Sequence, residues 1–440
     1  MKKIVASVGL VALGASGLYA QSGGSSIGSS SAKPWSVSAT LRGFYDDNVS
    51  TVSDDAQLPP GTKKDSFGFE ISPAFAIGLD MEQTKLKFGA VYSMKYYDNQ
   101  PLGSSDHYDQ SVTLSGGLEH RFNERYALSV RDNFVIGQEP DMLRSGSSFT
   151  SFQRISGDNI RNYGAVDFDA QMTRLLGLEV GYANTMTSYD DNHDNDQNIG
   201  MPNPASYTGL LDVLDHMIHI DTHWQVMPKT MFIAGYQFRY TDYTGDEQIG
   251  QEPNTGAPIW SDDRNAESHY MYIGVDQTFT PDLTGSVRGG ARYTDYPNNQ
   301  SSQDDWGPYA LASLKYTYRP DSYVEAGFSY DYNSTDLFSV ANDGSITLNA
   351  ESATIYATLH HKITPKLFGT LTGQVQESTY YGGLYDNDTD YYFLFGANLE
   401  YRFNQFLSGE LGYNYDRLKS DITTRSYDRN RVYIGVTGNY

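Results

Sequence analysis

Apolar and polar residues alternate with a period of two along most of this chain. Successive side chains of a β-strand point to opposite faces, so the alternation predicts strands with one apolar and one polar face. The predicted strands span ~10 to 13 residues, whereas strands in soluble sheets usually have about five or six. In the segment after Lys229, one face comprises Phe232, Ala234, Tyr236, Phe238 and Tyr240, and the other comprises Gly235, Gln237, Arg239 and Thr241.

Very short polar turns and long polar loops alternate between these strands. Eight turns lie at Met81-Glu82-Gln83, Asn123-Glu124-Arg125, Thr173-Arg174, Pro228-Lys229, Pro281-Asp282, Pro320-Asp321, Pro365-Lys366 and Asn404-Gln405. Nine loops lie near 47–65, 98–107, 138–158, 190–213, 244–267, 297–305, 335–350, 381–390 and 420–427. Together they require eighteen strands. This pattern predicts an all-β fold, a transmembrane antiparallel up-and-down β-barrel with short periplasmic turns and long extracellular loops.

A soluble propeller or an array of sandwiches is the alternative fold, since repeats of about 40 residues are common there too. The repeat in this chain contains two strands, however, and not the four of a propeller blade. Tyrosines also gather at the strand ends, as in Tyr96-Tyr97 and at Tyr240 and Tyr243. A tyrosine has an apolar ring and a hydroxyl that can remain in water, which suits the membrane–water interface, so the clustering favours the membrane barrel.

The first twenty residues predict a bacterial secretory signal peptide. A short basic start is followed by the apolar stretch Ile4–Leu13, which is too short for the ~20 residues of a membrane-spanning helix. Ala20 supplies the small residue of a cleavage site before Gln21. We therefore divide the chain into a signal peptide (1–20), a Ser/Gly-rich flexible segment (21–33) and the outer-membrane barrel (34–440).

Composition removes several classes of function. The chain has 31 basic and 54 acidic residues, a formal charge of −23, which disfavours nucleic acid as a partner because phosphates would be repelled. Cysteine is absent, which excludes disulfides and thiolate metal sites. Neither a phosphate-binding loop nor a His-Glu-x-x-His motif occurs, and the Gly-x-Ser-x-Gly match at 24–28 lies in the flexible segment. We expect no enzymatic activity and no cofactor.

Charged residues on the polar faces of the strands are the candidate functional residues. Inside a water-filled pore such a side chain needs no partner, whereas a cationic one facing lipid would cost about 2–4 kcal/mol at the bilayer midplane. The predicted lumen-facing set includes Lys85, Lys87, Lys95, Arg239, Arg288, Arg292, Glu179, Glu325 and Glu410.

Two groups are weak metal candidates. His219, Asp221 and His223 share one face of a predicted strand and could hold a metal or form an acid–base pair, or they could simply be a solvated lumen wall. The spacing of Asp194 and Asp196 hints at calcium. The glycine comes one position late, however, and Ala205 stands where an EF-hand loop needs glutamate.

Two segments suggest a resemblance to a known family, Trp35–Asn48 and Arg125–Pro140. The closing strand, Arg431–Tyr440, ends in an aromatic residue. The mature chain resembles bacterial outer-membrane β-barrel proteins of the putative beta-barrel porin-2 type. The resemblance implies a porin-like transport protein in the Gram-negative cell envelope, and some relatives are linked to exopolysaccharide export. The closing strand is similar to the signal read by the outer-membrane assembly machinery, which makes that machinery an expected partner through Tyr440.

The function that we predict is passive, weakly cation-favouring passage of small polar solutes through an outer-membrane barrel. The cation preference follows from acidic loops such as 190–196 and 386–390 at the outer mouth. Two alternatives stay open: an outer-membrane component of exopolysaccharide export, which inward aromatic rows would favour, and a surface binding or enzymatic barrel that uses its long loops. The expected partners are outer-membrane lipid and either small polar solutes or polysaccharide.

Overall fold

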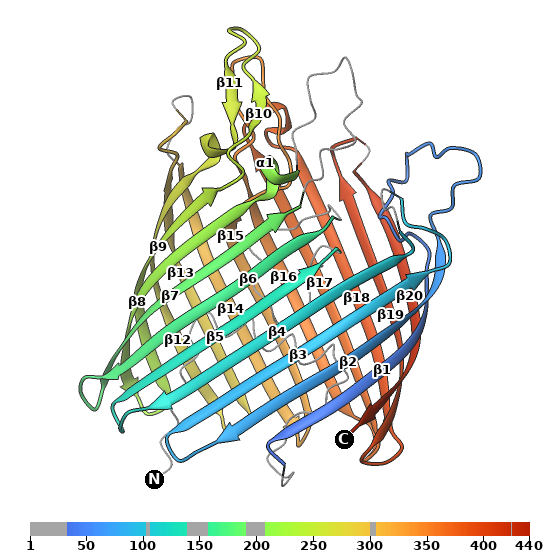
Figure 1. Ribbon diagram of the computed structural model, residues 1–440. Coiled ribbons are helices and arrows are strands. Elements are labelled where there is room, and N and C mark those ends of the chain that lie inside the picture. Colours follow the sequence, from blue (N-terminus) through green and yellow to red (C-terminus); the bar gives the residue numbers. More distant parts are fainter. Residues whose placement is uncertain (1–32, 103–105, 139–156, 191–206, 300–304, 424) are drawn as a thin grey trace.

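The computed structural model describes residues 33–102, 106–138, 157–190, 207–299, 305–423 and 425–440. Eighteen strands form one antiparallel sheet, and the sheet closes because the first strand, β1, pairs with both β2 and β20. Figure 1 shows the resulting barrel of tilted strands. The predicted fold class, an eighteen-stranded antiparallel barrel, is confirmed. The predicted signal peptide and most of the predicted flexible segment lie outside the described residues.

The strands of the barrel have twelve to fifteen residues. Their bounds are β1 (Trp35–Asp46), β2 (Ser66–Asp80), β3 (Thr84–Tyr97), β4 (Tyr108–Arg121), β5 (Tyr126–Gly137), β6 (Asn159–Gln171), β7 (Leu176–Tyr189), β8 (Val213–Met227), β9 (Thr230–Tyr243), β12 (Ala266–Thr280), β13 (Leu283–Asp295), β14 (Asp305–Arg319), β15 (Ser322–Asn333), β16 (Asn349–Lys362), β17 (Leu367–Tyr381), β18 (Thr389–Arg402), β19 (Leu407–Ser420) and β20 (Tyr427–Asn439).

The turns and loops fall where the sequence places them. The first loop occupies 47–65 between β1 and β2, and the first turn occupies 81–83 between β2 and β3. In Figure 1 the turns gather at the lower end of the barrel, with the C-terminus, and the described loops at the upper end. The sequence did not predict the small elements inside two loops. These are α1 (Tyr207–Leu211) and a hairpin of β10 (Gln248–Gln251) and β11 (Pro258–Trp260).

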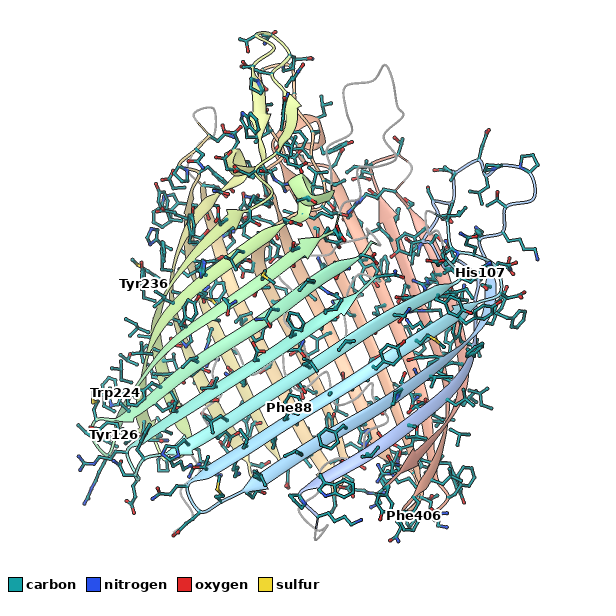
Figure 2. The ribbon with its side chains drawn as sticks, in the orientation of Figure 1. Phe88, His107, Tyr126, Trp224, Tyr236 and Phe406 are labelled. Atoms are coloured by element: carbon teal, nitrogen blue, oxygen red, sulfur yellow. The ribbon has the colours of Figure 1, made fainter. Side chains whose placement is uncertain are left out.

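Large apolar side chains cover the outside of the barrel. Val287 is 60% exposed and Ile434 is 66% exposed, values that would be unfavourable in water but suit contact with lipid tails. Tyr126 and Trp224 lie toward the turn end of this surface, and Tyr236 lies nearer the loop end (Figure 2). In the described residues no helix is long and apolar enough to cross a membrane.

A polar cluster on β5 and β6 interrupts this apolar outer face. Asp132 of β5 is exposed, and on the same face of its strand it lies between Val130 and Phe134. Asn162 of β6 donates a hydrogen bond from Nδ2 to Asp132 Oδ1, 3.3 Å away. Gly116 lies directly across from Asp132, so that a recess of about 560 Å³ opens beside the carboxylate. The amide contact reduces the cost of placing this carboxylate in the apolar belt.

A pair of neighbouring substitutions in β17 tests which face meets lipid. Leu371 is exposed on the outer face, and Thr372 is on the inner face. Leu371→Arg is expected to lower the free energy of unfolding by about 2–4 kcal/mol, because the guanidinium would enter the lipid. Thr372→Arg should have a much smaller effect. Urea unfolding in lipid vesicles, followed by tryptophan fluorescence, measures both, and equal losses would contradict the assigned faces.

Candidate functional site

The inner wall, meaning the side chains opposite the exposed apolar face, carries the polar residues of the strands. In β8, Ile218 and Ile220 are exposed on the outer face. The alternate positions therefore belong to the inner wall, and they are Asp215, Met217, His219, Asp221 and His223.

Strand alternation places all nine predicted lumen-facing charged residues on this wall. Lys85 and Lys87 of β3 are exposed close to the turn end, and Lys85 lies directly across from Glu119 of β4. Lys315 Nζ lies 3.2 Å from a carboxylate oxygen of Glu325, and the lysine side chain is about half exposed. The inner wall at the turn end therefore meets solvent.

An ion-pair group crosses the seam where the barrel closes. Arg42 of β1 donates from Nη1 to Glu70 Oε2 (2.8 Å) and from Nη2 to Glu410 Oε1 (2.7 Å). Glu410 belongs to β19, so its bond to Arg42 passes over β20. Gly435 of β20 makes this possible, because a Cβ there would lie 2.8 Å from Glu410 Oε1. The group fastens β2, β1 and β19 together.

Nearer the loops, arginines of the inner wall are buried in contact with carboxylates. Arg239 donates to Asp215 from Nη2 over 2.8 Å. Arg292 lies 3.0 Å from Asp305 Oδ2, and its guanidinium stacks 3.5 Å from the ring centre of Tyr332. Breaking one such buried pair leaves an uncompensated charge, so these contacts fix the wall at this level.

Three adjacent strands bring two carboxylates and an imidazole together. Asp167 of β6, Gly181 of β7 and His219 of β8 lie side by side, and Glu179 lies one step along the inner wall from Gly181. His219 Nε2 is 3.3 Å from Glu179 Oε1 and 3.7 Å from Asp167 Oδ1. Arg131 of β5 binds the other oxygen of Asp167. We call Asp167, Glu179 and His219 the acid–histidine group.

A second row of acidic residues lies next to this group. Asp169, Glu179 and Asp221 are cross-strand neighbours on β6, β7 and β8. Tyr272 of β12 reaches over Gly235 of β9 and donates its hydroxyl to Asp221 Oδ1, 2.7 Å away. The inner wall therefore carries more carboxylates than cations at this place.

The metal candidates of the sequence are only partly brought together. Of His219, Asp221 and His223, only His219 belongs to a group of ligand atoms within 4.8 Å of one another in the described residues. Its companions are Asp167 and Glu179, whereas residues two apart along one strand face are separated by about 6.5–7 Å. Asp194 and Asp196 lie outside the described residues. The pairing of Asp167 with His219 was not predicted, because it depends on the register between neighbouring strands, which places the two residues on either side of a glycine.

The loops that follow β7, β9 and β15 pack on one another. Ile249 and Ile259 of the β10–β11 hairpin form a buried cluster with Ile346 of the β15–β16 loop. Arg264 donates to the carbonyl oxygens of Leu210 and Thr335, and so joins the α1 segment to the same loop.

A buried arginine anchors that loop to the rim. Arg425, between β19 and β20, donates to Asp336 from Nη2 (2.7 Å) and to Asp390 from Nε (2.8 Å). Burial alone would lower the pKa of Arg425, but the carboxylates of Asp336 and Asp390 raise it well above its ordinary value. Arg425 therefore remains charged and keeps the β15–β16 loop docked near β18.

Comparison with known proteins supports the resemblance at the C-terminal end. A family model described as Putative beta-barrel porin 2 matches residues 350–440, which confirms the predicted resemblance over those residues. No curated protein matches the chain.

Several solved structures are similar in shape. A BenF-like porin from Pseudomonas fluorescens Pf-5 is 10% identical with a TM-score of 0.44, over 93% of this chain and 99% of that chain. OccAB4 from Acinetobacter baumannii is 11% identical with a TM-score of 0.43, over 93% and 99%. The outer membrane protein opdK from Pseudomonas aeruginosa is 12% identical with a TM-score of 0.42, over 92% and 99%.

The closed barrel, its apolar outer face and the family match lead to one conclusion. The chain is a porin-like β-barrel of the bacterial outer membrane, in contact with membrane lipid.

Removing the anchoring arginine should loosen the β15–β16 loop. Arg425→Met leaves Asp336 and Asp390 buried without a cation, so we expect faster protease cleavage within residues 334–348 of the folded barrel. Arg417→Met is the matched control, because Arg417 forms a largely exposed pair with Asp428 at 3.6 Å. Mass spectrometry of the fragments measures cleavage, and equal rates for the two variants would disprove the anchoring role.

Proposed function

We propose that the barrel gives small polar solutes passive passage across the outer membrane, with a weak preference for cations. The observation that carries this proposal is the solvent exposure of charged inner-wall side chains, such as Lys85, Lys87 and Glu119. Eighteen strands enclose a space too wide for wall side chains to fill, as in porins of 16–18 strands. Exposed charge on that wall requires water beside it.

The pairing of inner-wall charges supports weak selectivity. Most basic side chains of the wall contact a carboxylate, as Arg42, Arg239 and Arg292 do, so their fields are partly cancelled. The acidic row at Asp169, Glu179 and Asp221 adds negative charge, as do Asp262 and Asp263 in the loop after β9. Lys85 and Lys87 oppose this near the turn end, so the preference for cations should be small.

Two further expectations belong to this proposal. The family matched at the C-terminal end consists of porins, which are channels, and this supports the expectation that the chain has no catalytic activity. Tyr440 is exposed beyond the end of β20, on the same outer face as Val432 and Ile434. An exposed aromatic residue at the end of the closing strand suits recognition by the outer-membrane assembly machinery.

Export of a polysaccharide would be favoured by inward rings that a sugar could stack on. Tyr270, Tyr272 and Tyr309 form an aromatic group on the inner wall, but each is buried, and the Tyr272 hydroxyl is bonded to Asp221. These three rings therefore offer no stacking surface, and passive passage is the better supported function.

Conductance in a planar lipid bilayer tests the proposal. The purified barrel is expected to produce steady open channels, and a KCl gradient should give a reversal potential of the sign for cations. The potential should fall at high salt, because charges are screened within about 10 Å at 0.1 M. Clear anion preference at low salt would contradict the selectivity, and no conductance at all would contradict the pore.

Substitution of two lysines tests whether inner-wall charge sets the ion selectivity of the pore. Lys85→Gln with Lys87→Gln removes positive charge from the inner wall, so the reversal potential should shift further toward cations. Lys229→Gln removes one charge in a turn outside the barrel and serves as the control. A shift as large in the control as in the double variant would mean that the inner wall does not set selectivity.

A further inference from the structure

The inner wall holds an unbalanced group of carboxylates where β6, β7 and β8 run side by side. Asp167, Glu179 and Asp221 are each at least 95% buried. Arg131 contacts Asp167, and the hydroxyl of Tyr272 contacts Asp221. A buried carboxylate is costly unless a positive charge compensates it. One arginine does not balance three buried carboxylates, so this part of the wall favours an additional cation.

The ligand atoms of the acid–histidine group are spaced as a small metal ion requires. His219 Nε2 lies 3.3 Å from Glu179 Oε1 and 3.7 Å from Asp167 Oδ1, and all three ligand atoms lie within 4.8 Å of one another. In a tetrahedral zinc site, bonds of about 2.1 Å place neighbouring ligand atoms about 3.4 Å apart. Small side-chain movements would therefore complete three corners of such a site.

A second observation, independent of the number of acids, points to a ligand. Asp167 Oδ1 is buried and has no hydrogen-bond partner, although Arg131 occupies the other oxygen of the same carboxylate. His219 Nε2 approaches this oxygen to 3.7 Å. Gly181 keeps the space between these side chains open, because a Cβ there would lie 2.1 Å from His219 Cε1 and 2.5 Å from Asp167 Oδ1.

We propose that Asp167, Glu179 and His219 bind a divalent transition-metal ion of the Zn²⁺ or Mn²⁺ type on the inner wall of the barrel. Two carboxylates neutralise the charge of such an ion, and an imidazole suits it better than it suits Ca²⁺, which takes six to eight oxygen ligands. Bound there, the ion ties three adjacent strands together. The alternative occupant of this space is a proton on His219, which would pair with the same carboxylates.

Metal titration of the refolded mature chain, freed of metal with a chelator, tests the site. Zn²⁺ is added against a coloured competing chelator, and the native protein is expected to bind one equivalent tightly. His219→Gln and Glu179→Gln should each weaken that binding by at least about tenfold, since even groups that only orient a ligand change affinity 10–100-fold. His223→Gln is the matched control, because His223 lies on the same face of β8 outside the group.

The result can go against the proposal in two ways. If the native barrel shows no tight Zn²⁺ binding, the proposal is wrong and the space is occupied by a proton on His219. If all variants bind as tightly as the native chain, the ion sits elsewhere, such as on the acidic loops. Should neither variant fold, as judged by heat-dependent electrophoretic mobility, the Co²⁺ absorption spectrum of the native protein decides. Visible bands of tetrahedral Co²⁺ with nitrogen and oxygen ligands support the site, and their absence overturns it.

Discussion

Lipid offers no hydrogen-bond partners, and this constraint governs the rest of the structure. Each backbone N–H and C=O within the membrane must pair with another strand, so the sheet has to close. Closure depends on the contact of β1 with β20, which are nearly the whole chain apart in sequence. Side chains reinforce this seam: Arg42 joins β2, β1 and β19, and Arg429 binds Asp46 from Nε at 2.9 Å. The first strand is thus secured by backbone pairing and by ion pairs.

In the closed barrel most polar side chains lie on the inner wall, away from lipid. There they form hydrogen bonds and ion pairs that reach across more than one strand. Three contacts share the same arrangement, in which a glycine on the middle strand leaves room for side chains from the strands on either side. Gly435 lies under the contact of Arg42 with Glu410, Gly181 under that of His219 with Asp167, and Gly235 under that of Tyr272 with Asp221. Each contact spans two inter-strand spacings, about 10 Å of wall. These glycines therefore determine which inward charges can meet.

The sequence was sufficient for strand number, turns and faces, because those depend on a period of two and on local turn chemistry. The loop at 47–65 and the turn at 81–83 have the predicted bounds. The β10–β11 hairpin was missed because strands of four and three residues are too short to display a period. Glu179 was placed among the inward charges, but its meeting with His219 was not predicted. That meeting depends on the register between β7 and β8, which alternation within one strand does not reveal.

The paired charges of the wall set the scale of any selectivity. An ion in the lumen is attracted or repelled by the net charge of the wall beside it. Ion pairs such as Arg239 with Asp215 carry almost no net charge. Less compensated charge includes Lys87 near the turn end, which faces Gly78 and Gly117 on the neighbouring strands, and the acidic row beside His219. These have opposite signs. A cation bound at the acid–histidine group would cancel part of the negative excess and make Lys87 more influential. If the proposed passage and the proposed metal site both hold, occupancy of that group and the selectivity of the pore would be coupled through a single charge balance.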